Sequence, residues 1–158
     1  MPDLLPGTRV RGLDTPPTVQ NAQSGTYNFT ITAYGVAASS GTHVACGTAF
    51  VAPTSGRVKI THVGFIRNGS AGNGALISPV VRTGGTVGSG TVVKAADDVD
   101  CIQVNGNGSG TDGVRAGSSV VVGGLTPGDT YNVRLEHRVT PGGTGTATRR
   151  TVIVEPCT

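Results

Sequence analysis

Glycine is the feature of this sequence that most restricts its fold. The chain has 26 glycines among 158 residues, roughly twice the usual share of about 7%. Many stand in short clusters, such as Gly84-Gly85, Gly123-Gly124 and Gly142-Gly143. Glycine adopts the positive φ values that tight turns require. The clusters therefore predict turns between short strands, and the lack of a Gly-X-Y period excludes collagen.

Between the turns, apolar and polar residues alternate, as in a strand with one buried face. In residues 57–67, for example, Val58, Ile60, His62 and Gly64 share one face. No segment keeps an apolar period near 3.6 residues, so helices are not expected. The predicted strands are residues 27–34, 44–52, 57–67, 75–83, 91–96, 100–104, 118–122, 130–139 and 146–155. Short strands at this spacing predict an all-β fold, an antiparallel β-sandwich or jelly roll.

Residues 124–135 carry the most specific local pattern, Gly-Leu-Thr-Pro-Gly-Asp-Thr-Tyr-Asn-Val-Arg-Leu. Pro127-Gly128 has the composition of a turn, Leu125 can pack inward, and Tyr131 begins an alternating strand. This spacing predicts a tyrosine corner, in which the phenol hydroxyl binds a backbone group of the turn.

The first 25 residues differ from the rest because they are polar and rich in proline, with Pro2, Pro6, Pro16 and Pro17. Proline has no amide donor and disfavours regular ladders. We therefore expect an extended Pro-rich N-terminal arm over residues 1–25 and one β-sandwich domain over residues 26–158. Within the arm, a short strand that docks on a neighbouring protein is expected around the residues Arg9, Val10, Arg11 and Leu13.

The charge pattern argues against two classes of partner. The net charge is +3 and the arginines are spread along the chain, so no nucleic-acid-binding patch is expected. No apolar run is long enough for a transmembrane helix, so no membrane partner is expected. The three cysteines, Cys46, Cys101 and Cys157, are expected to be small buried thiols, and whether two of them form a disulfide stays open.

The motifs that would carry chemistry are incomplete. No serine stands in a Gly-x-Ser-x-Gly turn, and the Gly-x-Gly-x-x-Gly match at residues 108–113 precedes no predicted helix that could hold a dinucleotide. The pair His43 and Cys46 lacks the other half of a zinc site, and the acidic residues 97–100 lack a calcium loop. The sequence therefore predicts no catalytic residue, no metal site, no cofactor and no enzymatic activity.

A further set of strings is spread over the chain, at residues 4–10, 13–20, 50–58, 78–90, 124–137 and 149–154. These strings resemble small virion proteins of actinobacterial tailed phages, and the later part of the chain is similar to C1q/TNF-type jelly-roll knobs. The resemblance implies a virion location and a minor tail or fibre-tip component. It further implies a homotrimer whose partners are other virion proteins, such as a tail protein or the major capsid protein.

Three roles remain open at this point. A tail or fibre-tip protein would touch the host surface through its polar loops, where the candidate contact residues are Asn68, Asn73, Asn107 and Asp112. A capsid decoration protein would instead cement capsomers at symmetry axes. A glycan-binding adhesin module would bind a host cell-surface glycan by itself.

Overall fold

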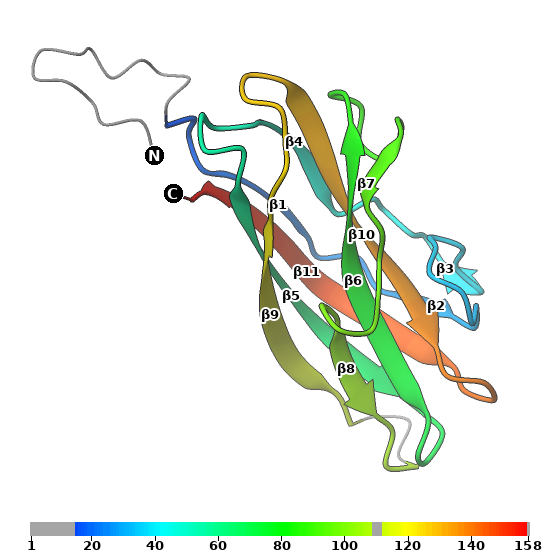
Figure 1. Ribbon diagram of the computed structural model, residues 1–158. Coiled ribbons are helices and arrows are strands. Elements are labelled where there is room, and N and C mark those ends of the chain that lie inside the picture. Colours follow the sequence, from blue (N-terminus) through cyan, green and yellow to red (C-terminus); the bar gives the residue numbers. More distant parts are fainter. Residues whose placement is uncertain (1–14, 109–111, 158) are drawn as a thin grey trace, which may run out of the picture.

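The fold is given by a computed structural model, which describes residues 15–108 and 112–157. Their regular structure consists of strands in two antiparallel sheets that pack face to face (Figure 1). This part of the chain has no helix, and so none that is long and apolar enough to cross a membrane. The prediction of an all-β sandwich is confirmed.

The first sheet, sheet A, is built around the long C-terminal strand. Its order is β3 (Ser40–Gly41), β2 (Tyr27–Phe29), β11 (Gly145–Pro156), β5 (Val58–Asn68) and β9 (Val114–Val122). A further strand, β1 (Val19–Gln23), pairs with β11 beyond the end of β2. Thus β1 and β2 together cover one side of β11.

The second sheet, sheet B, has the order β4 (Gly47–Val51), β10 (Thr130–Val139), β6 (Gly74–Thr83) and β7 (Val92–Lys94). The strand β8 (Ile102–Asn105) pairs with the other half of β6. If β1 with β2 and β7 with β8 each count as one interrupted strand, and the two-residue strand β3 is left out of the count, the sheets have the orders 1-8-3-6 and 2-7-4-5. Neighbours so distant in sequence form the double Greek key of a jelly roll.

The core between the sheets is mainly aliphatic. The predicted inward face of β5 is buried at Val58, Ile60, His62 and Gly64, because alternate side chains of a strand point to one side. The facing strands contribute further fully buried side chains, among them Ile77, Val81, Val133 and Leu135. The alternation in the sequence therefore located the core.

The predicted corner is present before β10. The Thr126 amide donates a hydrogen bond to the Tyr131 hydroxyl at 3.0 Å. Gly128 has a φ of 84°, which favours glycine, and its amide donates to the Ala52 carbonyl at 2.9 Å. Leu125 is buried in the core. The turn is thus held from both sides of its backbone.

The N-terminal segment differs from the prediction in one respect. Residues 19–23, which were expected in the arm, form β1 and pair with β11. Alternate residues of β1 are half-buried and none is fully buried. Its sequence, Val-Gln-Asn-Ala-Gln, lacks the apolar alternation that marks the other strands. The predicted boundary at residue 25 is therefore too late. The docking residues Arg9, Val10, Arg11 and Leu13 lie outside the described residues.

Two other differences concern short strands. The segment predicted as a strand over residues 27–34 is regular only in β2, to Phe29, and then continues as loop. The predicted strand over residues 118–122 extends back to Val114 in β9. Residues 114–117 include Gly117 and Arg115 and lack a strong apolar pattern, which explains why they were missed.

Candidate functional site

The loops of the sandwich gather at two opposite ends (Figure 1). At one end, the distal end, the β5–β6 and β8–β9 loops meet, and the Gly72 amide donates to the Gly106 carbonyl at 2.9 Å. At the other, proximal end, the Cys157 amide donates to the Arg57 carbonyl at 3.1 Å. Val19, where β1 starts, is paired with Val154 near that end. The described chain therefore begins and ends away from the distal loops.

The four predicted contact residues are all near the distal end, but one of them is not accessible. Asn68 is 1% exposed, and its amide group donates to the Gly74 carbonyl at 3.1 Å and accepts from the Ser70 amide at 2.9 Å. It holds the β5–β6 hairpin, which corrects its prediction as a contact residue. Asn73 is half-buried, and Asn107 donates to exposed Asp112 at 2.7 Å.

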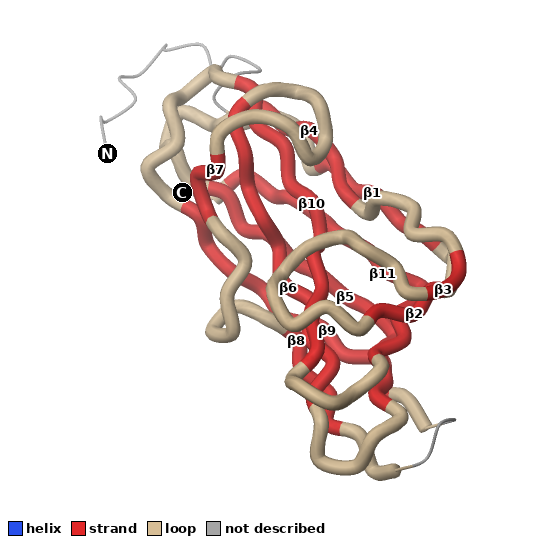
Figure 2. The backbone as a smooth tube through the Cα atoms, turned by 90° about the vertical axis from the view of Figure 1, so that its right-hand side faces the viewer, coloured by secondary structure: helices blue, strands red, loops and turns tan. Residues whose placement is uncertain are grey.

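Loops cover part of the outer face of sheet B, as Figure 2 shows. The loop after β6 folds back over Asn132, whose side-chain amide donates to the Gly84 and Ser89 carbonyls at 2.9 and 3.1 Å. The Asn132 oxygen accepts from the Gly88 amide at 2.9 Å. Asn132 is fully buried as a result. A ligand therefore has no access to this part of sheet B.

The cations on the outer face of sheet B are all paired. Glu136 Oε1 forms ion pairs with Arg82 Nη2 at 3.3 Å and with Arg134 Nη2 at 2.5 Å. Arg138 binds Asp98 through two nitrogens. Lys94 contacts two further carboxylates, on Asp97 and Asp100, at 2.9 and 3.0 Å. Because each charge has a partner within the protein, this face offers little electrostatic attraction to a ligand.

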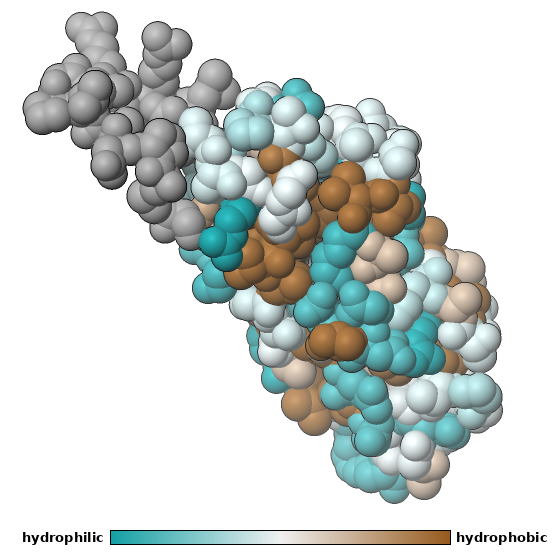
Figure 3. Space-filling view, viewed as in Figure 1, coloured by the Kyte–Doolittle hydropathy of each residue, from teal (hydrophilic) through white to brown (hydrophobic). Residues whose placement is uncertain are grey.

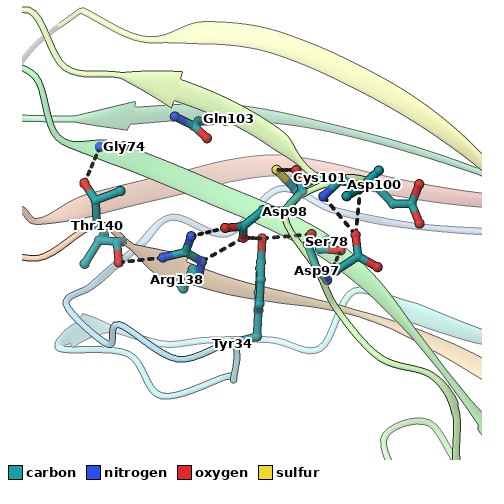
Figure 4. Close-up of polar contacts among 12 residues, drawn as sticks. Tyr34, Gly74, Ser78, Asp97, Asp98, Asp100, Cys101, Gln103, Arg138 and Thr140 are labelled. Atoms are coloured by element: carbon teal, nitrogen blue, oxygen red, sulfur yellow. Dashed lines mark hydrogen bonds and ion pairs between the residues drawn. The ribbon is translucent and has the colours of Figure 1, made fainter.

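Tyr34 also contacts the ion pair between Arg138 and Asp98 (Figure 4). Its hydroxyl donates to Asp98 at 2.9 Å and lies 3.1 Å from the Asp97 carbonyl, and the Arg138 guanidinium lies over its ring. Burial, followed by the hydrogen bond to Asp98, raises the pKa of Tyr34. The hydrogen bond from Arg138 holds the pKa of Asp98 below its usual value. The network pins the loop before β8 to β10, which is a structural role.

The outer face of sheet A is different because a β-bulge interrupts β11. Thr148 pairs with Phe65 and Thr151 pairs with Val63, so Arg149 and Arg150 together oppose the single residue Gly64. Arg149 has a φ of 49°, a left-handed conformation that is uncommon for residues other than glycine. The bulge separates the two side chains: Arg149 is exposed, whereas Arg150 is buried.

Arg150 enters the core without a carboxylate partner among the described residues. Its Nη2 donates to the Val44 carbonyl at 3.0 Å, and its guanidinium carbon lies 4.6 Å from the centre of the Tyr27 ring. Its Nη1 lies 3.4 Å from His43 Nε2, and an arginine can only donate there. His43 must therefore be neutral. Burial, and then the charge of Arg150, lowers the pKa of His43 to about 4.

Two other histidines lie between the sheets. His137 Nε2 lies 3.1 Å from the Ala37 carbonyl, so it donates there, and His137 Nδ1 accepts from the Tyr27 hydroxyl at 3.0 Å. His62 is equally buried, but neither of its ring nitrogens has a partner among the described residues. Burial lowers the pKa of both imidazoles to about 4. Both side chains are therefore neutral near pH 7.

Two hollows adjoin Arg149 on the outer face of sheet A. The first, the arginine hollow, has a volume of about 170 Å³ and is lined by Ala22, Gln23, Ser24, Arg115, Arg149, Arg150 and Thr151. The second, the phenylalanine hollow, has a volume of about 210 Å³ and is lined by Thr26, Phe65, Thr148 and Arg149. Among the described residues, no carboxylate lines either hollow. They form the candidate binding site of this chain.

Sequence reasoning did not find this site. One signal was available: the polar run Thr148-Arg149-Arg150-Thr151 interrupts the alternation of a long strand, which is typical of a bulge. The pairing of Arg115 with Phe65 across β9 and β5 depends on strand order, so the sequence could not reveal it. Within the described residues, no group of three or more His, Cys, Asp or Glu side chains is arranged to hold a metal ion.

No protein-family model and no curated protein matches this chain. Similar solved structures include infectious bursal disease virus, Gx strain, with a TM-score of 0.44 and 12% identity over 87% of this chain and 30% of the viral chain. A T13 particle of the same virus has a TM-score of 0.46 and 13% identity over 89% of this chain and 31% of that one. The chain thus spans less than a third of these viral chains.

A third similar structure is the CBM22-1 xylan-binding domain from Paenibacillus barcinonensis Xyn10C. It has a TM-score of 0.34 and 14% identity, over 87% of this chain and 94% of that domain. These TM-scores are low, and the jelly-roll assignment stands on the strand order of the chain itself. Within the described residues, the fold and the site define a jelly-roll domain in which loops cover part of the outer face of sheet B, while the outer face of sheet A carries two open hollows.

Proposed function

We propose that this protein is a structural component of a virion, a minor tail or fibre-tip protein that displays a jelly-roll domain for contact with the host surface. The observation that carries the proposal is the separation of the two ends of the sandwich. The described chain enters beside the C-terminal half of β11, while the β5–β6 and β8–β9 loops meet at the distal end. A segment anchored at the proximal end would leave the distal loops and the open face of sheet A free.

The proposal also draws on the sequence resemblance to phage virion proteins and on the use of jelly rolls in capsid and lectin domains. It assigns docking on other virion proteins to the Pro-rich N-terminal residues. It includes no cofactor and no enzymatic activity. Release of reducing ends from a host cell-wall polysaccharide incubated with the protein would contradict this last part.

Contacts between sister copies are part of the proposal. One edge strand of each sheet carries exposed valines, Val92 and Val93 on β7 and Val114 and Val121 on β9. Figure 3 shows hydrophobic residues in separate patches among hydrophilic ones on the face in view. An exposed strand edge is a template for pairing with another chain, which supports contact between copies, and the homotrimer is the form that the sequence resemblance implies. Light scattering on the purified protein tests it, and a monomer at all concentrations would contradict it.

The decisive experiment is deletion of residues 1–14 in the virus that encodes the chain. The described strands begin at Val19, so the sandwich keeps all its strands. We expect the shortened protein to fold, with an unchanged circular dichroism spectrum, and to be absent from purified particles. Incorporation of the shortened protein at the normal level would contradict docking through this segment.

A capsid decoration protein is the second candidate, and copy number separates the two. A tail tip would hold tens of copies in each particle or fewer, whereas a decoration protein would be present in hundreds. Quantitative mass spectrometry of purified particles measures this number. Labelled antibody in electron micrographs of the particles locates the protein on the tail or on the capsid.

A free glycan-binding adhesin module is the third candidate. The observation that favours it is the pair of hollows around Arg149, which lie on an uncovered face. Saturable binding to purified host cell walls by the protein, together with its absence from particles, would favour an adhesin over a virion component.

A further inference from the structure

The arginines around the bulge carry charge that no carboxylate of the described residues compensates. Arg115 and Arg149 are both exposed, and Arg115 Nη1 lies 3.5 Å from the Arg149 carbonyl. Neither forms an ion pair with a carboxylate of the described residues. Both residues line the same hollow, and like charges near one another repel each other. An anion bound between them would remove this repulsion.

The buried charge of Arg150 adds to the positive electrostatic potential around Arg115 and Arg149. Its side chain is 1% exposed and its Nε has no hydrogen-bond partner among the described residues. A cation with low-dielectric surroundings is screened less than a cation in water. Arg150 lines the arginine hollow together with Arg115 and Arg149. Among the described residues, three arginines and no carboxylate thus line this hollow. The Arg150 guanidinium itself lies in the core over the Tyr27 ring, so the exposed charges at the hollow are those of Arg115 and Arg149.

The arginine side chains suit carboxylate or phosphate groups. A guanidinium offers a planar set of donors that binds such a group through two parallel hydrogen bonds. Ser24 and Gln23 also line the hollow, and a hydroxyl and an amide can bind further oxygens of a ligand. The arginine hollow therefore has the donors that an acid group needs.

The phenylalanine hollow beside it suits the ring of a sugar. A Cβ atom on Gly113 would lie 2.5 Å from the Phe65 ring, so the glycine allows the ring to rest against the backbone before β9. Phe65 is half-buried and presents the rest of its surface to the hollow. Thr26 and Thr148, whose hydroxyls are 3.0 Å apart, complete the lining. An aromatic surface with flanking hydroxyls matches a sugar ring with its polar edge.

Both hollows are small and they share Arg149. Their volumes of about 170 and 210 Å³ are below the roughly 300–1,000 Å³ of pockets that enclose a small molecule. Two adjoining shallow sites fit a polymer that lies across the face of the sheet. Repetition of the site in an oligomer would raise the strength of such binding.

We propose that the open face of sheet A binds an acidic glycan, a sugar polymer whose units carry a carboxylate or a phosphate group. The acid group is bound by Arg115 and Arg149 in the arginine hollow, and an adjacent sugar ring packs on Phe65. This inference rests on the proposed display function and names the class of ligand on the host surface. The carboxylate and the phosphate are two sources of the same chemistry, which separate probes distinguish.

The test measures binding of three polymers to the full-length protein at low salt, about 50 mM, where screening is weak. The probes are polygalacturonate for carboxylates, poly(glycerol phosphate) for phosphates, and neutral dextran. We expect binding to one or both acidic polymers and none to dextran. Equal binding to dextran, or no binding to either acidic polymer, would overturn the inference.

Variants then connect binding to the site. The double substitution Arg115→Gln and Arg149→Gln is expected to weaken binding of the acidic polymer by about tenfold or more, because two charge-assisted contacts are lost. The matched control is Arg57→Gln, which removes an exposed charge at the proximal end that lines neither hollow. Unchanged binding of the acidic polymer by the double variant, or an equal loss of binding in the control, would contradict the proposal.

A second pair of variants separates a glycan from any other polyanion. Gly113→Ala displaces the Phe65 ring without altering charge, and Phe65→Leu removes the aromatic surface. Both are expected to weaken binding of the acidic glycan severalfold while leaving that of inorganic polyphosphate unchanged. A single-stranded DNA that binds as tightly as the glycan, with the same sensitivity to both variants, would overturn the glycan class. Melting curves of all variants establish that they are folded.

Failure of this inference is distinguishable from failure of the proposed function. If no acidic polymer binds but deletion of residues 1–14 still prevents incorporation into particles, the virion role stands and the glycan site is wrong. If the Arg115 and Arg149 double variant enters particles normally and those particles no longer adsorb to host cells, both are supported.

Discussion

The arginines on the outer faces of the two sheets differ in whether they contact a carboxylate. On sheet B, Arg82, Arg134 and Arg138 each contact a carboxylate, and loops cover part of the face. On sheet A, Arg115 and Arg149 have no carboxylate partner among the described residues, and the face around them is open. The one ion pair of sheet A in these residues, between Lys59 and Glu155, is exposed.

The same contrast continues inside the sandwich. His137, from sheet B, has a hydrogen-bond partner for each ring nitrogen, whereas His62, from sheet A, has none in the described chain. Buried polar groups are normally satisfied, and exceptions often mark a functional region. The two sheets therefore differ mainly in ion pairing: the arginines on the outer face of sheet B contact carboxylates, although Arg82 Nε and Arg134 Nε have no hydrogen-bond partner among the described residues, whereas exposed Arg115 and Arg149 on sheet A have no such carboxylate.

The largest expected effect is the response to acid. His62 and His137 have pKa values lowered by burial to about 4 from 6.5, so the unfolded chain takes up protons first as the pH falls. The stability they contribute is complete above pH 6.5 and is lost towards pH 4, by up to about 3 kcal/mol for each imidazole. Urea unfolding at pH 7.5, 6 and 5 measures it. A midpoint independent of pH would contradict the buried neutral state.

The next effect compares the ion pairs of the two faces. Glu136→Gln leaves Arg82 and Arg134 without their shared carboxylate, whose side chain is 8% exposed. We expect a loss of about 2–3 kcal/mol in the free energy of unfolding, somewhat less than for a fully buried pair. Glu155→Gln, the control on sheet A, should cost less than about 0.5 kcal/mol because its pair is exposed. Similar losses of stability for the two variants would contradict the difference in ion pairing between the two faces.

Replacement of the two buried histidines is expected to change the free energy of unfolding by smaller amounts, with opposite signs for His62 and His137. His62→Leu replaces two unpartnered nitrogens by carbon and is expected to stabilise the protein by about 1 kcal/mol at pH 7.5. His137→Leu deprives the Tyr27 hydroxyl and the Ala37 carbonyl of their partner and should destabilise it by about 1–2 kcal/mol. Both variants should reduce the loss of stability in acid. Destabilisation by His62→Leu would show that its nitrogens are satisfied.

The smallest effect concerns the backbone of the bulge. Arg149→Gly removes the strain of a left-handed non-glycine residue, which costs about 1–2 kcal/mol, and adds roughly 0.5–1 kcal/mol of chain entropy. The net result expected is a gain of about 0.5–1 kcal/mol with weaker binding of acidic glycan. Arg115→Gly, in the regular strand β9, should be destabilising instead. Calorimetry compares the two variants, and destabilisation by Arg149→Gly would refute the assignment of strain.

The fold could be predicted where local pattern and tertiary burial agree. The alternation in residues 57–67 placed Val58, Ile60 and His62 in the core, and the predicted strand over residues 130–139 coincides with β10. The Pro127-Gly128 turn could be predicted because its backbone demands are met by residues close in sequence. Prediction failed at β1, whose burial comes from pairing with β11, more than a hundred residues away.

The candidate site could not be predicted in the same way. Asn68 was placed in a contact loop because Asn-Gly is typical of turns, but pairing with β11 and its side-chain hydrogen bonds bury it. Arg115, Phe65 and Arg149 come from three strands that are neighbours only through the order β11-β5-β9. The doubled arginine in β11 marks a bulge in the sequence, but not which neighbours it faces.

By itself, the sequence determined that this chain forms short, turn-separated strands with one buried face each, because glycine conformations and the two-residue alternation are local properties. The tertiary structure alone decided which strands pair, which arginines meet a carboxylate and which side of β11 each bulge residue faces. Those outcomes depend on contacts between segments far apart in the chain, and the free energy of a charge depends on what lies beside it in space.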